Sequence, residues 1–88
     1  MNYVTEVANT FIKRRGTVLF LSPLDQQMIL DWQTEGIPLH IVCRAIDDVF
    51  NYRDQLPKKK RRAVRTISYC AEEVEAAFSE WCEMQVGR

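Results

Sequence analysis

Apolar residues recur along most of this chain at steps of three and four positions, the spacing of one face of an α-helix. The first such stretch places Val4, Val7, Ala8, Phe11 and Ile12 on one face. Three basic residues then occupy its last turn, where cations suit the negative end of a helix. Gly16 follows and can adopt the left-handed conformation that ends a helix. The pattern predicts a first helix that ends at Gly16.

A second helix is predicted to begin at Ser22-Pro23. Ser22 can cap the helix, Pro23 suits its first position, and Asp25 occupies the reciprocal place of a capping box. We expect the helix to end at Gly36 and to bury the face made by Leu24, Met28, Ile29 and Trp32.

A third helix is expected to start at Pro38, since proline lacks the N–H group that is unbonded at that position anyway. Its apolar stripe is Ile41, Val42, Ala45, Ile46, Val49 and Phe50. The connection around Gly36 is short, so the second and third helices form either a helical hairpin or a crossed helix-turn-helix pair.

The two remaining apolar stretches are of different kinds. Residues 17–21 form a short continuous apolar run without a partner strand, which favours an extended segment laid across the helices. After Pro57 follows a heptad-like apolar stripe made of Val64, Ile67, Ala71, Val74, Phe78 and Trp81. Its spacing is consistent both with one helix over about 58–85 and with a helix that is broken near Ser68. The predicted fold is all-α: one domain over 1–88, with four helices and a long last one.

Composition places the chain among ordinary globular proteins, because 47% of its 88 residues are hydrophobic and 27% are charged. The N-terminus lacks the features of a signal peptide, and no apolar run is long enough to span a membrane. The three cysteines, at positions 43, 70 and 82, are widely spaced among apolar neighbours, so we expect free thiols and a cytoplasmic location.

The twelve basic and twelve acidic residues cancel, but they are not mixed along the chain. Residues 53–65 carry seven cations and one anion, whereas residues 72–83 carry five anions and no cation. Neutrality is therefore the sum of two opposed blocks in one C-terminal segment.

The basic block is the first candidate site, because clustered Lys and Arg neutralise nucleic-acid phosphates. A second cluster near the end of the first helix would extend it if both lie on one face. The proposed contacts to DNA or RNA are Lys58, Lys59, Lys60, Arg61, Arg62 and Arg65, with Lys13, Arg14 and Arg15. The alternatives are a solvated charge run at the start of the last helix, or pairing with acidic helices of this molecule or of a partner.

The acidic block is the second candidate site. Its members are Glu72, Glu73, Glu75, Glu80 and Glu83. They form either a solvated outer face or a surface for a protein partner, including an antiparallel homodimer in which basic and acidic halves pair.

Catalysis and metal binding find no support in the residue pattern. The single histidine, His40, has no cysteine pair or second histidine near it, and no orienting acid or nucleophile can be assigned to it. Trp32 and Trp81 lie at stripe positions typical of a core, and Tyr69 is the aromatic residue expected at the surface. We predict no enzyme activity, no cofactor, no metal and no small-molecule substrate.

The stretch 29–46 resembles the pattern of DnaD-like primosome domains, in which an Ile/Trp-bearing helix and a Gly turn precede a helix with Ile-x-x-x-Ala-Ile. The matching positions are Ile29, Trp32, Gly36, Ile41, Ala45 and Ile46. Val74, Ala77, Phe78 and Trp81 occupy the apolar places of the family's last helix, and Glu73 stands where the family has Tyr. The chain is also similar to short helical bacterial proteins of unassigned function. The primosome resemblance implies a replication or DNA-associated accessory module.

Overall fold

The computed structural model describes residues 2–16 and 21–86. Within these ranges the chain forms α1 (Tyr3–Arg15), α2 (Pro23–Glu35), α3 (Leu39–Gln55) and α4 (Ala71–Val86), with no strand. Two 3-10 turns, η1 (Lys58–Lys60) and η2 (Ile67–Cys70), lie between α3 and α4. The predicted all-α architecture of four helices is confirmed. None of the described helices is long and apolar enough to cross a membrane.

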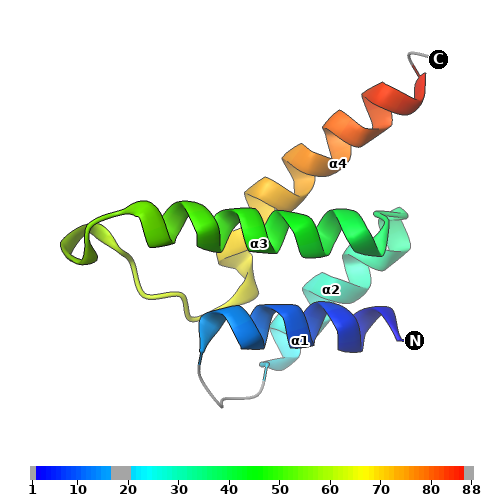
Figure 1. The fold of residues 1–88 in the computed structure, drawn as a ribbon. Coiled ribbons are helices and arrows are strands. Elements are labelled where there is room, and N and C mark those ends of the chain that lie inside the picture. The colour runs from blue at the N-terminus through cyan, green and yellow to red at the C-terminus, as the bar shows by residue number, and fades with distance from the viewer. Residues whose placement is uncertain (1, 17–20, 87–88) are drawn as a thin grey trace.

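The helices form two layers. α1 and α3 lie side by side and run in the same direction, so their C-terminal ends lie at one end of the molecule (Figure 1). α2 packs on α1 and α4 packs on α3 from behind this pair (Figure 1). The two front helices meet through Phe11 and Phe50, whose ring centroids are 5.9 Å apart. Both rings are buried, so α1 and α3 pack against each other through the core.

Local capping sets the predicted boundaries of α2. The Ser22 hydroxyl accepts a hydrogen bond from the Asp25 N–H at 3.2 Å. At the other end Gly36 has φ +85°, a conformation that glycine adopts without steric cost, and its N–H bonds to the Gln33 carbonyl. α2 and α3 diverge after this turn instead of lying side by side (Figure 1). The connection therefore makes a crossed pair and not a hairpin.

The inward face of α2 differs from the predicted one. Leu24 is 82% exposed, whereas Asp25 is only 4% exposed and stands one helical turn before the buried Ile29. The carboxylate of Asp25 accepts a hydrogen bond of 3.1 Å from the buried N–H of Ile67. A buried N–H group without a partner is costly, so the helix turns a polar residue inward at this place.

A continuous last helix over 58–85 is wrong, and the alternative of a break near Ser68 is the better description. Residues 61–66 are irregular, η2 covers Ser68, and α4 begins at Ala71. The apolar stripe still packs as predicted: Ile67 and Val74 are buried, and Val64 packs against the core from outside any helix. The predicted extended segment lies outside the described residues except for Leu21, which is buried.

We expect Asp25→Ala to lower the free energy of unfolding by about 1–3 kcal/mol, because the buried Ile67 N–H loses its acceptor. Asp25→Asn retains an acceptor oxygen and should cost less. The matched control is Asp31→Ala, an exposed aspartate of the same helix whose carboxylate, among the described residues, accepts a hydrogen bond only from Gln27. Urea unfolding of the three variants measures the difference. Equal losses for Asp25→Ala and Asp31→Ala would contradict the assignment.

Candidate nucleic-acid interface

The sequence suggested that the basic block starts a helix. In the structure the block instead follows one. Lys58, Lys59 and Lys60 form η1 directly after α3, and the block then continues through the irregular residues 61–66. The helix macrodipole explains this placement: cations are disfavoured at a helix N-terminus and favoured at a C-terminus. The lysines and arginines therefore surround the negative end of α3 and lie well before the positive end of α4.

The structure brings the two predicted basic clusters together. Arg15 at the end of α1 donates from Nη1 to the backbone carbonyl of Arg65 at 3.0 Å. Arg14, its neighbour, reaches Asp54 in the last turn of α3 at 3.5 Å. We call this part of the molecule the basic end; it consists of Lys13, Arg14, Arg15, Lys58, Lys59, Lys60, Arg61, Arg62 and Arg65.

Three arginines of the basic end have structural roles. Arg14 bonds Asp47 at 3.0 Å and Asn51 at 2.9 Å, and its guanidinium lies 5.6 Å from the centroid of the Phe50 ring. The Arg15 guanidinium lies 5.0 Å from the centroid of the Phe11 ring. The third arginine, Arg61, bonds carbonyls at the end of α3.

Arg61 closes the C-terminal end of α3. Its Nε donates to the Leu56 carbonyl at 2.9 Å and its Nη2 to the Asp54 carbonyl at 2.7 Å. The last carbonyls of a helix have no partner within the helix, so a guanidinium supplies both hydrogen bonds and a favourable charge there. Arg53 makes a similar contact, from its Nε to the Arg62 carbonyl at 2.9 Å. These bonds hold the basic loop against the helix.

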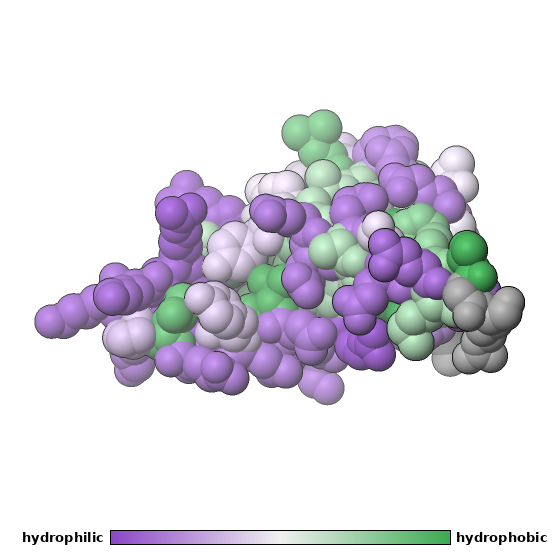
Figure 2. Space-filling model, turned by 90° about the horizontal axis from the view of Figure 1, so that it is seen from above, coloured by the Kyte–Doolittle hydropathy of each residue, from purple (hydrophilic) through white to green (hydrophobic). Residues whose placement is uncertain are grey.

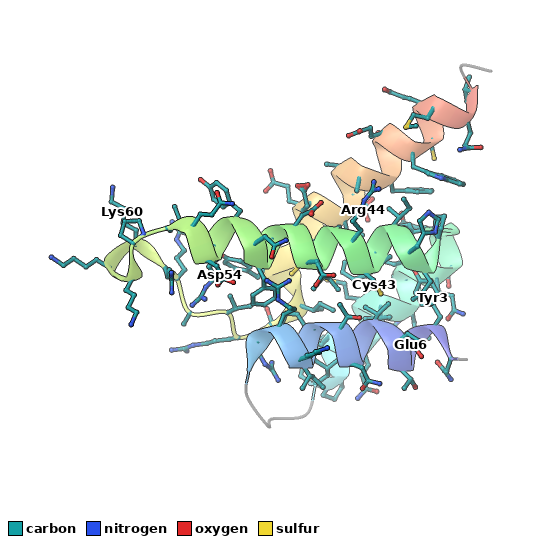
Figure 3. The ribbon with its side chains drawn as sticks, viewed as in Figure 1. Tyr3, Glu6, Cys43, Arg44, Asp54 and Lys60 are labelled. Atoms are coloured by element: carbon teal, nitrogen blue, oxygen red, sulfur yellow. The ribbon has the colours of Figure 1, made fainter. Side chains whose placement is uncertain are left out.

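The other six cations of the basic end point into solvent. Their side chains are exposed, and within residues 2–16 and 21–86 none of them forms a side-chain hydrogen bond or an ion pair; they are Lys13, Lys58, Lys59, Lys60, Arg62 and Arg65. Lys60 lies at the tip of the loop and extends away from all four helices (Figure 3). The same end is covered by hydrophilic residues in the view from above (Figure 2).

The acidic block does not neutralise these cations. Among the described residues the ion pairs are those of Arg14 with Asp47 and Asp54, and no glutamate of α4 takes part in one. Burial and the nearby Glu35 carboxylate raise the pKa of Glu75, with the Trp32 side chain acting in the opposite direction. The remaining glutamates, Glu72, Glu73, Glu80 and Glu83, are exposed along α4.

Other reactive groups lie apart from the basic end. Burial raises the pKa of the Cys70 thiol to about 12, so this sulfur is protonated at neutral pH and is a poor nucleophile. Burial and the nearby Cys43 and Glu35 raise the pKa of Tyr3 to about 12, and its hydroxyl donates to the Ile37 carbonyl at 2.8 Å. Within the described ranges no three His, Cys, Asp or Glu side chains are grouped to hold a metal ion.

Two features of this region were not predicted from the sequence. The first is the difference between anchored and exposed cations, since Arg61 and Arg62 are identical and adjacent. The second is Tyr52, which is 66% exposed on α3. Helical spacing could have found Tyr52, because it lies four positions after Asp48 on the polar side of the third helix.

A family model with the description "Uncharacterised protein" matches residues 2–88 of the chain. No curated protein and no solved structure matches it.

Arg61 and Arg62 provide a matched pair of charge-removing variants. Arg61→Gln removes two hydrogen bonds to the end of α3 and should lower the free energy of unfolding by about 1 kcal/mol. Arg62→Gln removes an exposed side chain that bonds nothing among the described residues, so its effect should stay within about 0.5 kcal/mol. Chemical denaturation of both variants measures this, and a larger loss for Arg62→Gln would refute the division.

Proposed function

The chain belongs to this family of uncharacterised proteins, and we propose that it is a non-catalytic binding module that contacts the phosphate backbone of DNA or RNA through its basic end. The observation that carries the proposal is the set of six exposed cations at the end where α1 and α3 finish. Phosphate contacts of this kind supply sequence-independent affinity.

The arrangement of the cations supports a polyanion as the ligand. A cluster of like charges without counter-charge is unfavourable in the free protein, and a chain of phosphates relieves that repulsion. The anchored arginines also favour binding, because their bonds to the carbonyls of Asp54, Leu56 and Arg65 fix the loop that carries the exposed cations. A ligand then meets a surface that is already ordered, and less conformational entropy is lost on binding.

The resemblance to DnaD-like primosome domains also supports a DNA-associated role. Its matching residues Ile29, Trp32, Ile41, Ala45 and Ile46 are all buried, and Gly36 forms the turn. The resemblance therefore concerns how α2 and α3 pack. The exposed cations lie outside the matched stretch, so they support nucleic-acid binding independently of it.

A second candidate is a protein-interaction or self-association module that uses the acidic residues of α4. The observation in its favour is that these glutamates take part in no ion pair within the described ranges, although an unpaired basic loop exists in the same chain.

The direct test is to titrate labelled single-stranded and duplex oligonucleotides at several salt concentrations. If all six exposed cations meet phosphates, the slope of log K against log salt approaches about −4 on single strands and about −5 on a duplex. A variant with Lys58, Lys59, Lys60 and Arg62 changed to Gln should bind far more weakly, with about a third of the slope. Arg61 is kept, so α3 remains closed.

Single substitutions supply the control. Arg62→Gln should reduce the magnitude of the slope by about 1, whereas Arg44→Gln removes the same charge from α3, outside the basic end, and should leave the slope unchanged. Absence of binding at low salt, or equal effects of the two variants, would show that the basic end is not the site.

A further inference from the structure

A groove with an unusual lining for a surface depression lies between α3, η2 and α4. Its volume is about 560 Å³, within the range of cavities that accept ligands. Two tyrosines form its walls: Tyr52 from α3 and Tyr69 from η2. Three carboxylates border them, those of Asp48, Glu72 and Glu73. We call this the tyrosine groove.

The chemistry of the tyrosine groove selects cations. The side chains of Tyr52 and Tyr69 are exposed, and the face of an exposed aromatic ring attracts an ammonium or guanidinium group. The three carboxylates attract the same groups by charge and repel phosphates. A nucleic acid is therefore a poor occupant, although exposed tyrosines alone could stack on bases.

We propose that the tyrosine groove binds the Lys58–Lys60 loop of a second copy of this chain. We choose this occupant because its charge is complementary to that of the groove. The loop presents three exposed lysines, and the groove presents three carboxylates. Neither set is neutralised within its own chain, because in the described residues none of these six side chains lies in an ion pair. Pairing between copies joins the two opposed charge blocks that make the chain neutral as a whole.

The positions of loop and groove allow the contact to be reciprocal. Tyr52 lies in the last two turns of α3, and the loop follows directly after that helix. Because both features lie near the same end of α3, a two-fold rotation beside this end places each loop on the partner's groove. Such an interface closes as a dimer instead of continuing as a fibre. The dimer occupies three of the cations that we assign to nucleic acid, so the two ligands compete.

The contact is formed between exposed charges, which salt screens strongly. In analytical ultracentrifugation we expect the wild-type chain to associate reversibly at low ionic strength and to sediment as a monomer at high ionic strength. Charge-swapped variants test the pairing itself. Lys58→Glu with Lys59→Glu reverses the loop, and Asp48→Lys with Glu73→Lys reverses the groove.

Each of the two variants has loops and grooves of the same sign, so each alone should be monomeric. Mixed together, the negative loop of one meets the positive groove of the other, and the positive loop meets the negative groove. The mixture should therefore restore the association that each variant lacks alone, more weakly than in the wild type because Lys60 and Glu72 are kept, and this also shows that both variants are folded. Glu80→Lys with Glu83→Lys carries the same charge change on α4 outside the groove and should associate as the wild type does.

A wild-type chain that stays monomeric at low salt overturns the proposal, as does a mixture that fails to associate when the wild type does. Loss of association in the Glu80→Lys, Glu83→Lys control would place the contact along α4 and also overturn it. The proposed nucleic-acid binding is judged separately, because the groove variant keeps every cation of the basic end. Oligonucleotide binding by that variant persists even where self-association is lost.

Discussion

The hydrogen bond from the Ile67 N–H to the buried carboxylate of Asp25 joins parts of the chain that are 42 residues apart. It satisfies a backbone group that burial would otherwise leave unbonded, and it fixes η2 against the start of α2. Because η2 is held there, α4 begins only at Ala71, and the residues between α3 and η2 must span the distance as a loop. The basic residues 58–65 therefore lie in η1 and in the irregular segment that follows it, outside the last helix.

Helix ends then determine what each cation does. α1 and α3 finish at the same end of the molecule, so the unpaired carbonyls of two helices meet there. Arg61 bonds the carbonyls at the end of α3, and Arg14 joins the last turns of α1 and α3 through Asp54. These anchors keep the loop ordered. The exposed lysines are left for a ligand, and the tyrosine groove on the neighbouring surface offers the opposite charge.

Helix boundaries that depend on neighbouring residues could be predicted from the sequence. Ser22 and Gly36 mark the ends of α2 because a cap and a left-handed turn depend on adjacent residues. For the last helix the sequence left a continuous helix and a break near Ser68 both open, since the contact between Asp25 and Ile67 that goes with the break is one that no periodicity reports. The same contact explains why Asp25 is buried on α2 and Leu24, which was expected in the core, is exposed. The basic block was visible as a candidate site, but the distinct roles of Arg61 and Arg62 depend on where the carbonyls of α3 point, which composition does not encode.

If the ordered basic loop presents its cations to a polyanion, two-dimensional amide NMR of the labelled chain with a short oligonucleotide will locate the contact. At a protein concentration where the chain is monomeric, we expect the resonances of residues 58–66 and of 13–16 to shift together as ligand is added, while those of α4 keep their positions. The Ile67 amide, held by Asp25, should remain protected from exchange throughout. Shifts concentrated on the acidic face of α4, or no shifts at low salt, would contradict the account.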